Sequence, residues 1–271
     1  MYTVPGMDKY LKANLKSWNA RVPVHAASRF YDVDGFLRGR NALLPIERRE
    51  VGQVKGKKLL HLQCHFGMDT LSWARLGARV TGADFSDRAI ARARDLAAKT
   101  ALKADFVLSD VYRLPRALKA KGKFDIVFAS YGVLCWIADI RRWMRVASHF
   151  LKPGGFLYIA ESHPFTNIMA MDGRSQELPY FNEGPALFPP EYTYTDGPRK
   201  AMPPTYEWCH PMSDILGAVK DAGLRLDFLH EFPYCAWERF KGMKKGRDGF
   251  YRLPRSRKSL PLLFSLKAFK K

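Results

Sequence analysis

The stretch from Leu59 to Gly67 constrains the fold of this chain more strongly than any other part of the sequence. It begins with closely spaced leucines after a polar run, a pattern that predicts a strand entering a buried sheet. Residues 68–76 then have the pattern of a helix, which Gly77 can end in a left-handed conformation. A strand, a tight turn and a helix together aim backbone N–H groups at a ligand, so the stretch predicts a nucleotide-type site.

An acidic residue follows this turn at a position that suits a nucleotide site. Asp84 closes a second apolar run, residues 78–83. An acid at the end of the second strand of a parallel sheet can accept hydrogen bonds from both ribose hydroxyls of a bound nucleotide. We therefore expect Asp84 to hold the sugar of a nucleotide-like cofactor.

Strands and helices alternate at short intervals through the middle of the chain. Ser86 is the expected N-cap of one helix, and Asp139 opens a later helix with apolar residues at helical spacing. This alternation predicts an α/β fold built on a doubly wound, mostly parallel sheet. The predicted strands are 59–62, 78–83, 106–108, 124–130 and 156–160, and the predicted helices are 68–76, 87–99 and 139–150.

Residues 59–161 resemble the core of the class I S-adenosylmethionine (SAM)-dependent methyltransferases, of the Rossmann-like type that acts on small molecules. The first motif of that family is an acid followed by three glycines at alternate positions. In this chain His61 stands in place of the acid. Gln63 and His65 replace the first two glycines, and Gly67 keeps the third.

The later motifs of the family occur here in the expected order. Asp84 and Asp110 close successive strands after the first motif. Residues 124–127 resemble the family's fourth strand, and residues 151–155 resemble the turn before its fifth. The resemblance implies SAM as the cofactor and a seven-stranded sheet whose last strand lies antiparallel beside the fifth.

The resemblance also implies which residues contact the cofactor. The Asp110 carboxylate is expected to accept from the adenine amine, while the Val111 N–H donates to a ring nitrogen. Phe85 is expected to stack on the adenine or the sugar, and Ser130 to lie near the methyl-donor end. Structural alternatives are an aspartate that caps a turn and a phenylalanine that packs under the sheet. The predicted cofactor contacts are Gln63, His65, Gly67, Asp84, Phe85, Asp110, Val111 and Ser130.

Methyl transfer from a sulfonium needs alignment and exclusion of water more than it needs acid–base help. A general base is required only when the attacking group must lose a proton. The candidates are Glu161, His163 and His210. We predict His163 as the base, because Pro164 favours an extended backbone that turns it towards a cleft. The alternative is a turn histidine that hydrogen-bonds to backbone.

His61, Cys64 and His65 are close in sequence, which raises the question of a metal site. On a strand, however, His61 and Cys64 point to opposite faces, and His65 belongs to the turn. A metal site would also need further ligands from elsewhere in the chain. We therefore expect no metal and a buried, hydrogen-bonded His61. His65 is expected to contact the cofactor or the substrate, or to point to solvent.

The rest of the chain is expected to surround the core. Residues 1–58 form an N-terminal cap, whose aromatic part at 18–36 is predicted to close as a lid over the cofactor. Residues 59–271 form the SAM-binding domain, with its core at 59–161. A lid-like insertion after the fifth strand, rich in proline, glycine and aromatic residues, covers 162–211. The other predicted elements are helices 10–20 and 213–222 and a C-terminal hairpin of strands 224–232 and 260–266, within residues 212–271.

The composition allows a large core and gives a strongly basic chain, with a net charge of +19 over 271 residues. Such charge can indicate a nucleic-acid partner. The charges are spread along the chain, however, and only 239–258 is dense, which favours a solvated basic surface. The four cysteines form no Cys-x-x-Cys pair, which predicts reduced thiols in a cytoplasmic protein. No apolar run suits a signal peptide or a membrane span.

These observations favour a SAM-dependent methyltransferase that acts on a small molecule, by in-line transfer in a water-excluded cleft. Residues 18–36 and 162–210 are expected to line an aromatic acceptor pocket. One alternative is an RNA or protein methyltransferase, indicated by the charge. Another is a SAM- or nucleotide-binding module without catalysis, indicated by the altered first motif. A dinucleotide enzyme would normally carry Gly-x-Gly-x-x-Gly, which the sequence lacks.

Overall fold

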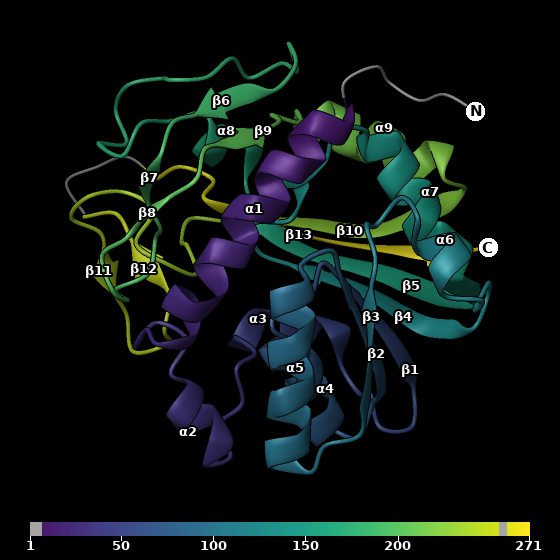
Figure 1. The fold of residues 1–271 in the computed structure, drawn as a ribbon. Helices are drawn as coiled ribbons and strands as arrows, with labels where there is room; N and C mark the ends of the chain where they lie inside the picture. The colour runs from purple at the N-terminus through teal and green to yellow at the C-terminus, as the bar shows by residue number, and fades with distance from the viewer. Residues whose placement is uncertain (1–6, 255–258) are drawn as a thin grey trace. The chain divides into compact units, whose positions relative to one another are not determined.

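The computed structural model describes residues 7–254 and 259–271 and has an α/β fold (Figure 1). Residues 1–6 of the predicted cap and 255–258 of the basic segment lie outside the described residues.

Seven strands form one sheet in the order β10-β13-β5-β4-β1-β2-β3. β1, β2 and β3 pair in parallel, as do β4 and β5, whereas β13 runs antiparallel to both β5 and β10. This arrangement confirms the predicted mostly parallel sheet and the antiparallel last strand. The strands are β1 Lys58–Leu62, β2 Arg79–Asp84, β3 Ala104–Leu108, β4 Phe124–Ser130, β5 Leu151–Ser162, β10 Leu224–Phe232 and β13 Leu263–Lys270.

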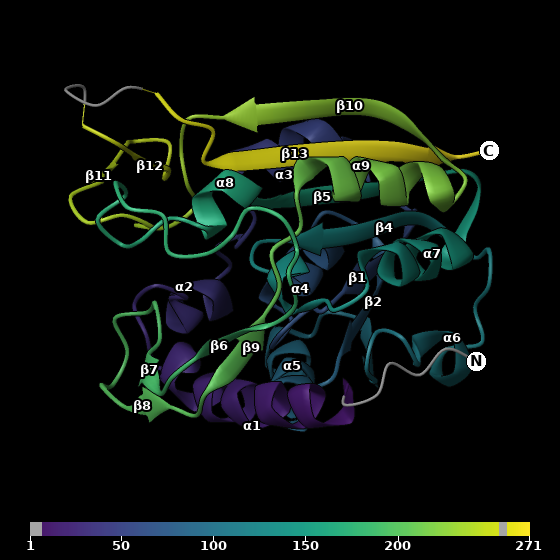
Figure 2. The same cartoon turned by 90° about the horizontal axis from the view of Figure 1, so that it is seen from above.

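The described chain divides into two compact units, of which the first comprises residues 7–43, 54–120 and 186–207. Figure 2 shows its long first helix, α1, beside the short strands β8 and β9. Besides β1 to β3, this unit contains helices α1 Met7–Ala26, α2 Val33–Leu37, α4 Met68–Arg75, α5 Asp87–Thr100 and α6 Leu114–Ala117, and strands β6 Ala186–Phe188, β7 Glu191–Tyr192, β8 Ala201–Met202 and β9 Thr205–Glu207.

The second unit comprises residues 44–53, 121–185 and 208–271 without the four undescribed positions. It contains β4, β5, β10 and β13, and α7 packs against α9 in it. Its remaining elements are α3 Pro45–Val51, the 3₁₀ turn Leu134–Trp136, α7 Ile140–Phe150, α8 Pro164–Asn167, α9 Met212–Asp221, β11 Lys244–Lys245 and β12 Tyr251–Arg252.

Several elements differ in extent from the prediction. β5 begins at Leu151 and so includes the predicted turn 151–155, and the last strand, β13, covers Leu263–Lys270 instead of 260–266. The helix expected at 10–20 continues to Ala26 through Pro23, because its last turns are buried: Val22, Val24 and His25 are at most 5% exposed. The insertion at 162–211, for which the sequence predicts no helix or strand, contains α8 and two strand pairs, β6–β9 and β7–β8. Strands of two or three residues are too short for hydrophobic alternation to reveal them.

The core of the first unit explains why Gly67 is a glycine. A Cβ added there would lie 2.8 Å from the Phe106 ring and 2.9 Å from the Cβ of Ala93. Gly82 is similarly close to Phe106 and to the Cys64 sulfur. Gly67 is therefore fixed by the packing of β3 and α5 against the first turn. In the described part of the chain, no helix has both the length and the apolar character required to cross a bilayer.

Candidate functional site

The loop after β1 has an alternating left-handed backbone. Gln63, His65 and Gly67 have φ angles of 55°, 50° and 80°. Glycine adopts this conformation at no steric cost, whereas a residue with a side chain is strained in it. The loop therefore has the backbone form that glycines would give it, although two of its three left-handed positions carry long side chains.

Asp84 joins this loop to the end of β2. Its carboxylate accepts hydrogen bonds from the backbone N–H of His65 (2.8 Å) and of Ser86 (2.9 Å). The residue is only 6% exposed, and burial raises its pKa from 3.8 to about 6, although the N–H donors act in the opposite direction. Asp84 is thus a buried carboxylate, mostly ionised at neutral pH, at the carboxyl edge of the sheet.

The predicted adenine contacts lie in the turn that follows β3. The Asp110 carboxylate accepts weakly from the Tyr112 N–H at 3.3 Å, and the Asp110 carbonyl accepts from the Arg113 N–H. Val111 is buried in the same turn, and Phe85 is half-buried directly after Asp84. Asp110 therefore has the turn-capping contact of the structural alternative, and its role towards adenine stays a prediction.

A group of rings surrounds His65, and we call it the His65 cluster: Trp18, His25, Tyr31, His65, Phe66 and Tyr194. The His65 ring centroid lies 5.2 Å from those of Trp18 and His25 and 4.2 Å from that of Phe66. Tyr31 lies nearly parallel to both imidazoles, at 5.3 Å from His25 and 5.7 Å from His65. The cluster thus places two histidines side by side among aromatic faces.

Both histidines of the cluster are held neutral. Burial, followed by the charges of His65 and Arg21, lowers the pKa of His25 to about 2. Burial and then Arg21 lower the pKa of His65 to about 3. The His25 Nε2 is 2.7 Å from the Thr193 hydroxyl. The His25 Nδ1 and the His65 Nε2 are buried and have no hydrogen-bond partner among residues 7–254 and 259–271.

Comparison with known proteins identifies the middle of the chain. Residues 60–159 match the family model described as a methyltransferase domain. They form a class I SAM-dependent methyltransferase domain. The match confirms the predicted family and gives SAM as the family's cofactor.

The relatives agree with this assignment over part of their length. A ubiquinone biosynthesis O-methyltransferase of Xanthomonas euvesicatoria is 30% identical over 137 residues, which are 49% of this chain and 56% of the relative. One of Sinorhizobium fredii is 34% identical over 107 residues, which are 40% and 42% of the two chains. The chain therefore spans about half the length of the curated relatives it matches.

Solved structures share the fold at low sequence identity. A putative SAM-dependent methyltransferase of Listeria monocytogenes has a TM-score of 0.58 at 14% identity, covering 83% of this chain and 95% of its own. A SAM-dependent methyltransferase of Mesorhizobium loti has a TM-score of 0.56 at 19% identity, covering 86% and 100%. These likenesses show that the fold of the methyltransferase domain extends over most of the chain.

The 186–207 segment, which lies outside the part matched by the methyltransferase domain model, is fastened to α1 and to the residues that follow it. Asn14 exchanges two 2.8 Å hydrogen bonds with the backbone of Tyr206. Arg29 forms an ion pair of 2.8 Å with Asp196, and the Tyr31 and Tyr194 hydroxyls are 2.6 Å apart. The positions of Thr193 and Tyr194 beside the histidines had no local sequence signal, because their partners are more than 160 residues away.

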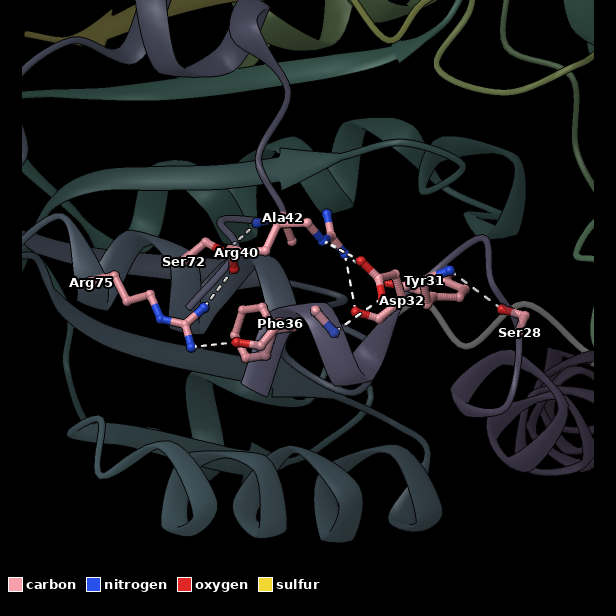
Figure 3. Close-up of polar contacts among 9 residues, drawn as sticks. Ser28, Tyr31, Asp32, Phe36, Arg40, Ala42, Ser72 and Arg75 are labelled. Atoms are coloured by element: carbon pink, nitrogen blue, oxygen red, sulfur yellow. Dashed lines mark hydrogen bonds and ion pairs between the residues drawn. The ribbon is translucent and has the colours of Figure 1, made fainter. Parts of the chain in front are cut away.

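The part of the predicted lid that follows α1 is tied to α4 (Figure 3). Asp32 accepts from the Gly35 N–H and forms an ion pair with Arg40. Arg75 donates at 2.7 Å to the carbonyls of Arg40 and Phe36, and its guanidinium lies over the Phe36 ring. Val33 and the fully buried Phe36 also belong to the core of the first unit. Residues 33–36 therefore have the contacts of a fixed cap, and closure of residues 18–36 stays a prediction.

The predicted residues of the second unit lie at the ends of β4 and β5. Ser130 is half-buried at the last position of β4, and Tyr131 after it has a φ of 33°. The Tyr131 hydroxyl donates to the buried Glu47 at 2.9 Å. The buried Glu161 carboxylate accepts from the backbone N–H groups of Gly132, Val133, Leu134 and Ser162. Glu161 thus shapes the loop after β4.

Both candidate histidines of the second unit are engaged in structural contacts. His163 accepts from the Phe165 N–H at Nδ1 (3.1 Å) and pairs with Glu231 at Nε2 (2.8 Å). Burial lowers its pKa, and Glu231 opposes that shift. His210 contacts the Ile137 carbonyl at 2.6 Å, and burial lowers its pKa as well. The prediction of His163 as a base therefore requires that one of its two bonds open.

His61 is buried, and its Nδ1 lies 2.8 Å from the Thr70 hydroxyl, as expected for a core histidine. Burial lowers its pKa to about 3. Within the part of the chain that the structure describes, no three His, Cys, Asp or Glu side chains are grouped to hold a metal ion.

Proposed function

We propose that this chain transfers the methyl group of SAM to a small-molecule acceptor. The observation that carries the proposal is the buried Asp84 carboxylate at the carboxyl end of β2, bonded to the left-handed loop of a methyltransferase domain. SAM supplies a methyl group activated on a sulfonium sulfur. The protein's part is to orient that group, to align the acceptor with it and to exclude water.

The residues of the first unit fit the cofactor. An ionised carboxylate offers about four acceptor positions. At Asp84, backbone N–H groups of His65, Ser86 and Phe85 use three, which leaves room for a ribose hydroxyl. The unpartnered buried nitrogens of His25 and His65 also call for a bound polar group. Asp84 would therefore hydrogen-bond to the ribose. The loop at Gln63, His65 and Gly67 would lie along one side of the ligand.

The remaining cofactor contacts follow the family's pattern. Asp110 and the Val111 N–H would bind the adenine, and Phe85 would stack on the adenine or sugar. Ser130 would lie near the methyl-donor end. If the acceptor must lose a proton, His163 is proposed to take it after release from Phe165 or Glu231. These roles are supported by the ends of β2, β3, β4 and β5, where the residues lie.

An oxygen atom is the proposed methyl acceptor. Relatives that match about half of this chain are named O-methyltransferases. The aromatic character of the His65 cluster supports a small acceptor with apolar surface. The proposed location is the cytoplasm, where the four free cysteines would remain reduced.

Calorimetry with S-adenosylhomocysteine (SAH) and with NAD tests the proposed cofactor. We expect SAH to bind and NAD to give no heat of binding. A methyl-transfer assay with labelled SAM and a panel of small hydroxylated compounds then tests turnover. Binding of NAD in preference to SAH would refute the proposed function. Binding of SAH without turnover of any compound, while an RNA or protein substrate is methylated, would replace the small-molecule acceptor.

A further inference from the structure

We infer that residues 186–207 form a β-hairpin that opens and closes over the ring nitrogens of His25 and His65. An ion pair between Arg29 and Asp196 at its tip holds it closed. We call this segment the hairpin arm. The inference goes beyond the proposed function, because it concerns how a ligand reaches these nitrogens and not which ligand is bound.

The short strands of the hairpin arm belong to one hairpin. β6 pairs with β9 and β7 pairs with β8, and both antiparallel pairs follow one continuous register. Residues 193–200 form the loop at the tip. Figure 2 shows β8 and β9 beside α1. A two-stranded hairpin is marginally stable by itself, so the position of the arm depends on its contacts with α1 and with the residues that follow this helix.

The base of the hairpin arm, where β6 pairs with β9, is fixed to α1. Asn14 is 4% exposed and exchanges two hydrogen bonds of 2.8 Å with the Tyr206 backbone. The ring centroids of Tyr10 and Tyr206 are 4.7 Å apart. Breaking buried hydrogen bonds leaves polar groups without partners and is costly. We therefore expect the base to stay on α1 when the tip moves.

The tip of the hairpin arm is held by an ion pair that opens more easily. The Asp196 carboxylate pairs with the Arg29 Nε at 2.8 Å and accepts from the Phe30 N–H at 3.0 Å. The side chains of Arg29 and Asp196 are 93% and 37% exposed. An ion pair in contact with water contributes little to stability and is screened by salt. The tip can therefore leave α1 at small cost, and the ionic strength controls how often it does so.

Buried polar atoms lie beneath the tip. The Thr193 hydroxyl is 2.7 Å from the His25 Nε2, and the Tyr194 ring centroid is 4.9 Å from that of His25. Within the described chain, the His25 Nδ1, the His65 Nε2 and the Thr195 hydroxyl are buried without a hydrogen-bond partner. Such groups raise the free energy of the closed form unless a bound polar group satisfies them. The tip thus covers atoms that a ligand can satisfy, and it must move for the ligand to enter.

A glycine allows the tip to approach α1 closely. A Cβ added at Gly197 would clash with the Val24 carbonyl oxygen, which belongs to the backbone of α1. A helix carbonyl cannot move away as the end of a flexible side chain can. A methyl group at this position would therefore displace the tip without changing the charges of the arm.

Limited proteolysis of the full chain with trypsin tests the inference, because the exposed Arg199 and Lys200 lie in the tip loop. Cleavage requires several residues around the bond to enter the protease, so its rate follows the population in which residues 193–197 have left α1. We expect Arg29→Gln and Asp196→Asn each to raise the rate about 2- to 5-fold, the effect of an exposed ion pair. About 1 M NaCl should raise the wild-type rate by a similar factor and should change either variant little.

Gly197→Ala opens the arm by a steric route, and we expect it to raise the rate of tip cleavage by at least about 10-fold. Gly217→Ala is its matched control, since α9 has space for a methyl group there. Glu191→Gln removes the same charge as Asp196→Asn from an exposed position on the same hairpin, and it should leave the rate unchanged. Cleavage at the exposed Lys244 and Lys245, followed in the same samples, is the internal reference.

The reference separates opening of the arm from damage to the fold. If Gly197→Ala accelerates both cleavages, its fold is damaged, and the charge variants and the salt series decide the test. Equal tip cleavage in the wild type, Arg29→Gln and Asp196→Asn, or a wild-type rate that salt does not change, overturns the inference. The hairpin arm is then a fixed brace of α1.

SAH links the motion of the arm to the site beneath it. In a wild type that binds SAH, saturating SAH should slow cleavage at the tip, because the ligand favours the closed form. Tip cleavage that SAH leaves unchanged or accelerates would show that the arm does not close over this site. Failure of the wild type to bind SAH would refute the proposed cofactor instead. The variants and the salt series need no ligand and would still decide whether the arm opens.

Discussion

Asp84 and Glu161 are both buried carboxylates at the carboxyl ends of sheet strands, and they are used in different ways. Asp84 ends β2 and accepts backbone N–H groups from its own turn and from the loop after β1. Glu161 lies near the end of β5 and accepts four backbone N–H groups, three of them from the loop after β4. Burial raises the pKa of both carboxyl groups, against the effect of these donors.

The two carboxylates differ in the number of hydrogen-bond acceptor positions that remain unused. Four N–H bonds use the acceptor capacity of Glu161, so this side chain fixes the form of a loop and cannot also take a substrate proton. Asp84 keeps an acceptor position for a hydrogen bond from a ligand. Of two residues that look alike in sequence, an acid after an apolar strand, one therefore has a structural role and the other is proposed to bind the cofactor.

The largest expected effect comes from removing the structural carboxylate. Glu161→Ala would leave four backbone N–H groups without their acceptor, and we expect a loss of roughly 3–4 kcal/mol in the free energy of unfolding. Urea denaturation at neutral pH measures it. Glu161→Gln, which keeps one acceptor oxygen, should lose less, and the exposed Glu183→Ala is the matched control. A loss below that of Glu183→Ala would show that the loop does not depend on Glu161.

The second effect is a pH dependence that belongs to Asp84. Its folded-state pKa is raised from 3.8 to about 6, so as pH rises the unfolded chain loses this proton first. The stabilisation that comes from the raised pKa of Asp84 is fully present below pH 3.8. It is lost as pH rises through about 6, and the loss in the free energy of unfolding is at most about 3 kcal/mol. Urea denaturation across this window should show the decline in the wild type. Asp84→Asn should make the decline smaller, and the raised pKa of Glu161 accounts for a part that remains. An equal decline in that variant would assign the effect to other groups.

The third effect concerns the cofactor. Asp84→Ala should weaken SAH binding by about 1–3 kcal/mol, the cost of hydrogen bonds lost to a charged acceptor. Asp110→Ala should weaken it less, because the Val111 N–H would remain. Calorimetry measures both, with the half-buried Asp95→Ala as control, since that carboxylate pairs with Arg92 and Lys99 on α5. Unchanged affinity in a folded Asp84→Ala protein would remove this residue from the ribose site.

A smaller effect is expected in the dynamics of the N-terminal segment. Residues 33–36 are anchored in the core and to α4, so their amides should exchange slowly with or without ligand. Residues 18–32 contact the core through the His65 cluster and should gain protection on adding SAH. Hydrogen exchange measured by mass spectrometry resolves the two parts. Slow exchange throughout 18–36 without ligand would make the whole segment a fixed cap.

The smallest effect is expected at the basic segment. Two of its arginines already contact other groups of the protein, since Arg252 forms an ion pair with Asp248 and Arg239 donates a hydrogen bond to the Met169 carbonyl. Neutralising Lys244, Lys245 and Arg247 together should leave turnover of a small acceptor nearly unchanged. The opposing result is RNA binding by the wild type with a steep salt dependence that this variant flattens.

The sequence by itself determined the sheet and the places where ligands would meet it. Apolar runs of strand length, the N-caps at Ser86 and Asp139, and glycine after α4 predicted the alternation that the structure contains. These signals are local, because strand and helix periodicity depends on a few neighbouring residues. The same local signals placed Asp84 and Asp110 at the ends of β2 and β3.

Only the tertiary structure decided how the side chains are used. It places Thr193 beside His25 and Tyr194 beside Tyr31, although each pair is more than 160 residues apart in sequence. It also lets the Glu161 carboxylate accept hydrogen bonds from backbone N–H groups about 28 residues earlier in the chain. No sequence period reports such pairs, because long-range packing selects the partners of a buried polar atom. The left-handed backbone at His65 also depends on tertiary contacts. The glycine motif is altered at two positions, and the loop keeps its form through the packing at Gly67 and the hydrogen bond from the His65 N–H to Asp84.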